Sequence, residues 1–307
     1  MNTLITIVGP TAIGKTALSI KLAKHFNCDI LSCDSRQFYK EMTIGTAVPE
    51  PFELEAAQHH FIQNRSVFED YNVGSFEKDA IKKLNQLFTE NPTQIMVGGS
   101  GLYVNAVLKG LDYFPDVDSK IRKNLSKELQ ENGIETLQEK LKELDYKSYE
   151  KVAIDNPHRL IRALEICIGA NKPYSYFINK EKEPRNFKSI KVGLIADREI
   201  IYDRINQRVD IMIENGLLEE AKALYPHKDL NALQTVGYRE LFEYFDGNWD
   251  LDFAISEIKK NTRRFAKRQL TWFRRDTETL WFDFKDDHIQ IINKIEDLQR
   301  ENLNSKS

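Results

Sequence analysis

Residues 9–16 read Gly9-Pro10-Thr11-Ala12-Ile13-Gly14-Lys15-Thr16. The stretch matches the phosphate-loop pattern GxxxxGK followed by Ser or Thr. The apolar run 3–8 before it predicts a strand, and the amphipathic stretch 15–26 after it predicts a helix. In such a loop the backbone N–H groups and the helix N-terminus face an anion, and the lysine adds positive charge. We therefore expect all eight residues to bind a di- or triphosphate, with the hydroxyl of Thr16 available to Mg²⁺.

The rest of the first third alternates short aliphatic runs with amphipathic stretches. Residues 30–33 and 94–97 are typical of buried parallel strands, and residues 76–90 are typical of a helix. This alternation predicts an α/β fold in which a P-loop-type parallel sheet carries helices on both faces. A fourth candidate strand, 190–196, follows only after a long gap.

The gap is charge-rich and has helical periodicity, with apolar residues such as Ile121, Leu125 and Leu129 at a spacing of four. We expect residues 112–187 to form an all-helical insertion domain. Residues 1–111 and 188–307 would then form the catalytic core, with mostly helical structure after the fourth strand.

Composition excludes several classes of protein. The 307 residues contain 44 Lys and Arg against 47 Asp and Glu, which excludes a polycation but leaves room for a local basic patch. No apolar stretch approaches the roughly 18 residues of a membrane span. The odd number of cysteines, Cys28, Cys33 and Cys167, without a CxxC pair suits a reducing cytoplasm.

Two further loops follow predicted strands. Asp34 ends the second strand, and carboxyl ends of parallel strands face the ligand crevice, so it is a candidate general base or metal-shell acid. The alternative is a helix N-cap. Gly98-Gly99-Ser100-Gly101 follows the third strand and offers a hydroxyl, although such a loop can be only a turn. Because no acid follows residues 94–97, the phosphates can serve as a leaving group or a handle without NTP hydrolysis.

Several segments, taken in order with the phosphate loop, carry a resemblance that runs to about Trp281. They include Asp34-Ser35-Arg36-Gln37, His59-His60-Phe61-Ile62, Gly98-Gly99-Ser100-Gly101-Leu102-Tyr103, Asn156-Pro157-His158-Arg159-Leu160-Ile161-Arg162, Gly237-Tyr238-Arg239-Glu240 and Lys267-Arg268-Gln269-Leu270-Thr271-Trp272. The ordered set resembles the tRNA dimethylallyltransferases, also called tRNA isopentenyltransferases.

The resemblance implies an activity. It is the transfer of a dimethylallyl group from dimethylallyl diphosphate to N6 of adenosine 37 in tRNAs reading codons that begin with U, giving N6-isopentenyladenosine. Lys15 and Thr16 would bind the diphosphate with Mg²⁺, and Asp34 would accept the proton from N6. Ser100 stands where the family usually has Thr. Other departures are Glu41 for Gly, Thr43 for Asp and Val48 for Lys.

The resemblance also implies the binding residues. Arg208 would join the phosphate loop in binding diphosphate or nucleotide. The anticodon stem-loop of tRNA would be contacted by Asp34, Ser35, Arg36, Gln37, Ser100, Arg122, His158, Arg159, Leu160, Ile161, Arg162, Arg239, Arg264, Lys267, Arg268 and Gln269. Nothing in the sequence demands more than a monomer.

The stretch 259–275 contains eight basic residues and no acid, with Phe265, Trp272 and Phe273 between them. This pattern favours phosphate contacts and stacking on RNA. The alternative is a solvated helix face with the aromatics in the core, and the spacing of seven between Phe265 and Trp272 predicts that both are buried. For Arg204 and Arg208, both a diphosphate site and pairing with Asp203 and Glu199 are open.

Three other functions compete with RNA prenylation. A small-molecule kinase with a helical lid would leave the basic tract unexplained. A non-catalytic RNA-binding module would leave Asp34 and the complete phosphate loop without a role. An adenylate prenyltransferase has a small acceptor and would not need the basic tract.

Overall fold

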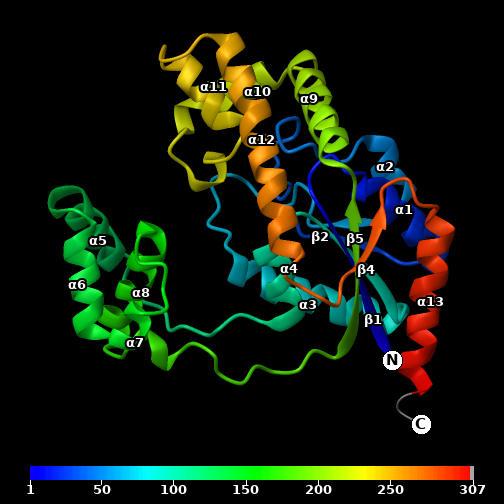
Figure 1. Cartoon of the computed structure of the whole chain (residues 1–307), viewed down its shortest axis with the longest axis horizontal. Helices are drawn as coiled ribbons and strands as arrows, with labels where there is room; N and C mark the ends of the chain where they lie inside the picture. The colour runs from blue at the N-terminus through cyan, green and yellow to red at the C-terminus, as the bar shows by residue number, and fades with distance from the viewer. Residues whose placement is uncertain (305–307) are drawn as a thin grey trace. The chain divides into compact units, whose positions relative to one another are not determined.

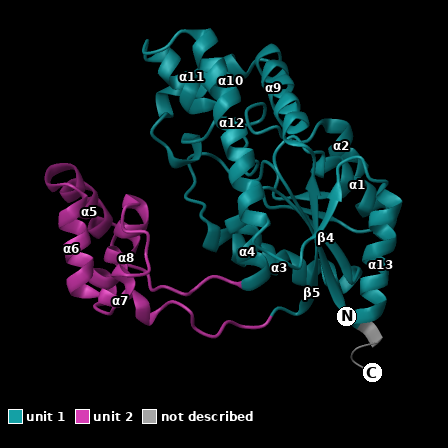
Figure 2. Ribbon diagram, in the orientation of Figure 1, with its two compact units in different colours: residues 1–109, 185–307 teal, residues 110–184 magenta. Residues whose placement is uncertain are grey.

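The structure, a computed structural model, describes residues 1–304. These residues form two compact units (Figure 2): one contains residues 1–109 and the described residues from 185 onward, and the other contains residues 110–184. The inserted unit therefore begins two residues before the expected boundary at 112 and ends three residues before the expected boundary at 187.

The larger unit is built on one six-stranded sheet in the order β3-β2-β4-β1-β5-β6, and all neighbours pair in parallel. The strands are β1 (Asn2–Val8), β2 (Ile30–Ser32), β3 (His59–His60), β4 (Thr93–Val97), β5 (Phe187–Ile195) and β6 (Leu280–Asp283). Four of them match predicted strands, but β5 begins earlier than expected. The other two, β3 and β6, have only two and four residues and are not among the predicted strands. The predicted fold class is confirmed.

Alternate residues of the central strand β1 pack into two separate hydrophobic cores, one on each face of the sheet. Ile5 and Ile7 pack with the helices on one face, whereas Leu4 and Val8 pack with those on the other. This is the period of two that a strand buried on both sides must show. Helices α1 (Lys15–Phe26), α9 (Arg198–Glu214), α12 (Leu251–Phe273) and α13 (His288–Asn304) supply the first core, and α3 (Val73–Glu90) and α4 (Gly101–Lys109) supply the second.

A third core lies beside the sheet, where α9 and α12 pack with α10 (Leu217–Leu224) and α11 (Tyr238–Phe245) (Figure 1). Glu220 of α10 fixes the chain that follows β2, because its carboxylate accepts the N–H groups of Thr43, Ile44 and Gly45 at 2.9 Å each. The short α2 (Pro51–Ala56) lies against α1. Within the described residues, no helix is long and apolar enough to cross a membrane.

The inserted unit is helical, with α5 (Ser119–Asn132), α6 (Ile134–Leu144), α7 (Tyr146–Tyr149) and α8 (Pro157–Ala170) around their own core. Leu125, Leu137, Leu141, Leu160 and Leu164 are at most 2% exposed. The helices start at sequence-encoded caps: Asp118 accepts the N–H of Lys120, and Asn156 accepts that of Arg159 ahead of Pro157.

Candidate active site

Three loops converge at the carboxyl ends of β1, β4 and β2, which are neighbours in the sheet. They are the phosphate loop, the turn from Gly98 to Gly101, and the turn that starts at Asp34. Topology brings them together, because parallel strands end at the same edge.

The phosphate loop has the backbone of an anion cradle. Gly9 and Gly14 adopt φ angles of 148° and 107°, and a side chain at Gly9 would come within 2.8 Å of the carbonyl oxygen of Leu194 in β5. No side chain caps the N-terminus of α1. The first N–H groups of the helix therefore stay available to an anion.

Lys15, the first residue of α1, is only partly exposed. Its ammonium donates to the carbonyl oxygen of Pro10 at 2.7 Å. Burial lowers the pKa of Lys15 to about 8, although the nearby carboxylate of Asp34 acts in the opposite direction. Because burial disfavours the charged form of Lys15 in the free protein, a bound anion would stabilise that ammonium strongly.

Asp34 uses one carboxylate oxygen locally. Its Oδ1 accepts the N–H of Arg36 at 3.0 Å, which is the local turn contact expected of a capping residue. Among the described residues, Oδ2 has no hydrogen-bond partner, and Asp34 lines a cavity. The capping and functional interpretations are therefore compatible.

Ser100 ties two of the three loops together. Its Oγ lies 3.1 Å from both the backbone N–H and the Oγ of Ser35. Arg36 and Gln37 are also engaged with the protein: the Arg36 guanidinium donates to the carbonyl oxygens of Asn231 and Ala232, and the Gln37 amide donates to that of Ala47. Their side chains thus hold loops together at the rim of the site.

The cavity has a volume of about 450 Å³ and combines a charged end with apolar walls. Thr11, Asp34, Ser100 and Arg208 supply the polar groups. The apolar walls come from Ile205, Val209, Met212, Leu217, Val236, Ile258, Phe265 and Trp272. Such a cavity suits a ligand with an anionic head and a short hydrocarbon tail.

Arg204 and Arg208, two of the arginines of α9, both reach the phosphate loop. Arg208 Nη1 lies 3.5 Å from Thr11 Oγ1, and Arg204 Nε donates to the carbonyl oxygen of Ala12 at 2.6 Å. Burial lowers the pKa of Arg208, and Asp34 opposes that effect. Of the two alternatives, the structure therefore favours the diphosphate site over pairing with Asp203 and Glu199.

Gln269 faces inward from α12 and lines the cavity, with only 5% of it exposed. Its contact with RNA stays a prediction. Its Oε1 accepts the N–H of Thr11 and its Nε2 donates to the carbonyl oxygen of Gly99, each at 2.9 Å. One amide thus joins α12 to two of the three loops. Its spacing from the buried Ala266 and Phe273 is the sequence signal for this inward position.

The basic face of α12 is partly exposed. Arg264, Lys267 and Arg268 point to solvent, whereas Lys259 forms an ion pair with Asp210 at 2.6 Å. The expectation that Phe265 and Trp272 are buried is wrong: they are 38% and 37% exposed, and Phe273 alone fills the core. The phase of the helix places both rings at the cavity wall.

The residues of the inserted unit that were expected to contact RNA divide into three groups. His158 and Arg159 are exposed. Leu160 and Ile161 are buried in the core of the unit, so their side chains support α8 and cannot touch RNA.

Arg122 and Arg162 form a third case. Both hold the carboxylate of Glu165, with Arg122 Nε at 2.7 Å from it. Burial acts to raise the pKa of Glu165, but the two arginines outweigh it and lower that pKa.

In the larger unit, Arg239, which was also expected to contact RNA, is exposed at the start of α11.

Comparison with known proteins identifies the family. Residues 37–276 match the family model described as IPP transferase. The chain belongs to this family. The resemblance found in the sequence is thereby confirmed.

Individual relatives agree with the family match. The chain is 63% identical over 301 residues to a tRNA dimethylallyltransferase of Flavobacterium psychrophilum, covering 96% of this chain and 98% of that one. A solved tRNA isopentenylpyrophosphate transferase of Bacillus halodurans is 37% identical, with a TM-score of 0.72, over 100% of this chain and 98% of that one. A eukaryotic dimethylallyltransferase solved acting on tRNA gives a TM-score of 0.78 at 26% identity, over 93% of this chain and 75% of that one.

Proposed function

We propose that this protein transfers the dimethylallyl group of dimethylallyl diphosphate to N6 of adenosine 37 in tRNA and releases diphosphate. The observation that carries the proposal is the single cavity in which the phosphate loop, Asp34 and apolar walls meet. The names of the relatives and the family match support the same reaction. They favour it over a kinase, an adenylate prenyltransferase or a non-catalytic RNA-binding module.

The phosphate loop binds the leaving group. As the bond between the allylic carbon and the diphosphate oxygen breaks, negative charge grows on that oxygen. The N-terminus of α1, Lys15 and Arg208 lie where they oppose this charge. The apolar wall holds the hydrocarbon tail and keeps water from the reacting carbon.

Asp34 serves the acceptor. The N6 amine forms a bond to the allylic carbon and passes one proton to a carboxylate oxygen of Asp34, so charge balances across the step. Ser100 keeps the Asp34 turn in place through Ser35. The adenine must leave its base stack to reach this cavity.

The donor set also suits Mg²⁺. This ion prefers oxygen ligands and commonly binds through substrate phosphates plus one or two protein groups. The Thr16 hydroxyl on the first turn of α1 and the phosphate oxygens provide such a set, and bound Mg²⁺ would neutralise charge on the diphosphate. Among residues 1–304, no cluster of three or more His, Cys, Asp or Glu is arranged to hold a metal.

Exposed basic residues form the RNA-binding surface of the proposal. In the larger unit they are Arg239, Arg264, Lys267 and Arg268, and in the inserted unit they are His158 and Arg159. All three catalytic loops come from one chain, so we propose a monomer. The free cysteines fit a protein of the cytoplasm, where tRNA is modified.

Incubation with Mg²⁺, labelled dimethylallyl diphosphate and unmodified tRNA that reads codons beginning with U tests the proposal. Label on N6 of adenosine 37 after nuclease digestion is the expected result. No label, combined with ATP-dependent phosphorylation of a small acceptor, would replace the proposal with the kinase. Label on free AMP but not on tRNA would instead identify an adenylate prenyltransferase.

A further inference from the structure

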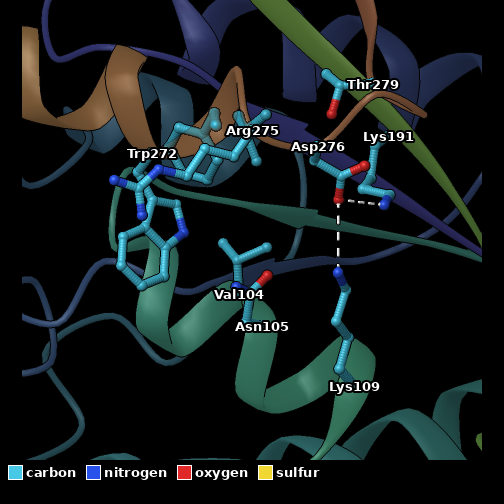
Figure 3. Close-up of a pocket in the computed structure, with 10 residues that line it drawn as sticks. Val104, Asn105, Lys109, Lys191, Trp272, Arg275, Asp276 and Thr279 are labelled. Carbon is cyan, nitrogen blue, oxygen red and sulfur yellow. Dashed lines mark hydrogen bonds and ion pairs between the residues drawn. The ribbon is translucent and has the colours of Figure 1, made fainter. Parts of the chain in front are cut away.

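A second cavity, of about 220 Å³, lies between the C-terminal parts of α4 and α12. Val8, Val104 and Phe273 make its apolar part. Figure 3 shows Trp272 and Arg275 on one side of Val104, with Lys191 and Asp276 on the other. Apart from Trp272, this cavity holds none of the groups assigned to prenyl transfer.

Trp272 lines this cavity and also the reaction cavity. Its indole is fixed against the start of α4, because a Cβ on Gly101 would lie 2.3 Å from the ring. A rigid aromatic ring, partly exposed, therefore separates the two cavities. A group bound on the far side of Trp272 would be an immediate neighbour of the group reacting beside Asp34.

The second cavity also presents polar groups without partners. The half-buried amide of Asn105 and the guanidinium of Arg275 form no hydrogen bond or ion pair within the described residues. Thr279 is only 8% exposed, and its hydroxyl likewise has no partner among those residues. These polar groups are therefore available to hydrogen-bond a bound ligand.

The charges of this cavity favour an anionic group. Lys191 Nζ lies 2.5 Å from Asp276 and 3.2 Å from Glu278, so its charge is compensated. Lys109 is 3.9 Å from Asp276 and mostly exposed. With Arg275 it leaves an excess of positive charge at the opening.

We propose that this cavity binds a second, unpaired nucleotide of the RNA, next to the reacting adenosine. The base stacks on Trp272, its edge meets Asn105 and Thr279, and its phosphate meets Lys109 and Arg275. A flat aromatic ring, a free amide and cations are the groups that proteins use for unstacked bases. The proposal rests on the proposed function, because it takes RNA as the substrate.

The test uses RNA hairpins with 2-aminopurine, a fluorescent base, at each position flanking the target adenosine. Stacking on Trp272 should change the fluorescence at one position only. A matched hairpin that lacks the base at this position should bind wild-type protein about tenfold more weakly, the scale of one stacked base. Asn105→Ala and Asn105→Ser should weaken the intact hairpin severalfold and leave the abasic one unchanged.

Arg274→Ala is the matched control, because Arg274 is an exposed cation beside Arg275 that does not line the cavity. It should affect both hairpins equally. Equal binding of the two hairpins to wild-type protein, or equal weakening of both by the Asn105 variants, would overturn the second site. Prenylation of the intact hairpin by wild-type protein is measured in parallel. Its absence would refute the proposed function, whereas its presence with equal hairpin binding would refute the nucleotide site alone.

Discussion

The phosphate loop and helix α12 line the same cavity, but they present their functional groups in different ways. The loop offers backbone N–H groups, whose direction depends on local φ angles such as those of Gly9 and Gly14. Helix α12 offers side chains, whose direction depends on how the helix packs. A local motif therefore locates the first kind of group residue by residue. The second kind can be located only when the buried face of the helix is known.

The largest effect should come from the side chain assigned to the proton. Asp34→Asn keeps an oxygen for the N–H of Arg36 but cannot accept a proton. We expect transfer to fall by about 10²- to 10⁴-fold, the range for loss of a general base. Single-turnover measurement of labelled product checks this rate, and tRNA affinity should stay within twofold.

The same variant tests whether the phosphate loop works without Asp34. Dimethylallyl diphosphate should still bind, because the α1 N-terminus and Arg208 are intact. A variant that turns over within tenfold of wild type would remove Asp34 from the role of base.

The exposed part of α12 should give the next largest effect. Lys267→Ala combined with Arg268→Ala removes two cations that have no ion pair within the described residues. RNA binding should weaken by about tenfold, and the slope of log affinity against log salt should become less steep by about 1.4, or 0.7 per lost phosphate contact. Titration of tRNA at several salt concentrations measures both.

A matched pair on the same helix sharpens this result. Lys259→Ala with Lys260→Ala removes the same charge, but these lysines already form ion pairs with Asp210 and Glu257. Their loss should change the salt slope less. Identical slopes for the two double variants would mean that net charge, and not position on α12, sets RNA affinity.

Ligand binding by the phosphate loop should depend on pH, whereas RNA binding by α12 should not. Burial lowers the pKa of Lys15 to about 8 in the free protein, so Lys15 is mostly charged below pH 8 and neutral above it. Because diphosphate binding needs the ammonium, affinity for dimethylallyl diphosphate should be nearly complete at pH 7 and fall by about tenfold between pH 7 and pH 9. Calorimetric titration across this range provides the measurement.

Lys15→Met is the control for pH. It should bind the diphosphate weakly and with no dependence on pH near 8. A wild-type affinity that stays constant from pH 7 to pH 9 would show that Lys15 remains charged in the free loop.

The sequence predicts local motifs of this molecule better than the direction of side chains on its helices. The phosphate loop, helix 15–26 and the core strands could be predicted because motif and apolar runs are local. The contacts of Arg36 and Leu160 could not be predicted from the sequence. Arg36 holds carbonyl oxygens of a distant segment, and Leu160 fills a core. These roles depend on partners far away in sequence, which periodicity does not reveal.

The smallest effect, and the most direct test of the comparison, belongs to the residue that joins the two regions. Gln269→Leu leaves the N–H of Thr11 and the carbonyl of Gly99 without their partner. We expect the KM for dimethylallyl diphosphate to rise about fivefold and stability to fall by about 1–3 kcal/mol, the usual cost of unpaired buried groups. RNA affinity should stay within twofold.

Steady-state kinetics, RNA titration and chemical denaturation separate these quantities, and Thr271→Ala supplies a neutral polar change on the exposed face of the same helix. A buried Gln269 acts on the phosphate loop through Thr11, so its loss must appear in the KM for the diphosphate. If Gln269→Leu instead weakened RNA tenfold with an unchanged KM, the residue would contact RNA as the sequence suggested. Helix α12 would then act on RNA alone, with no link from its inner face to the loop that holds the leaving group.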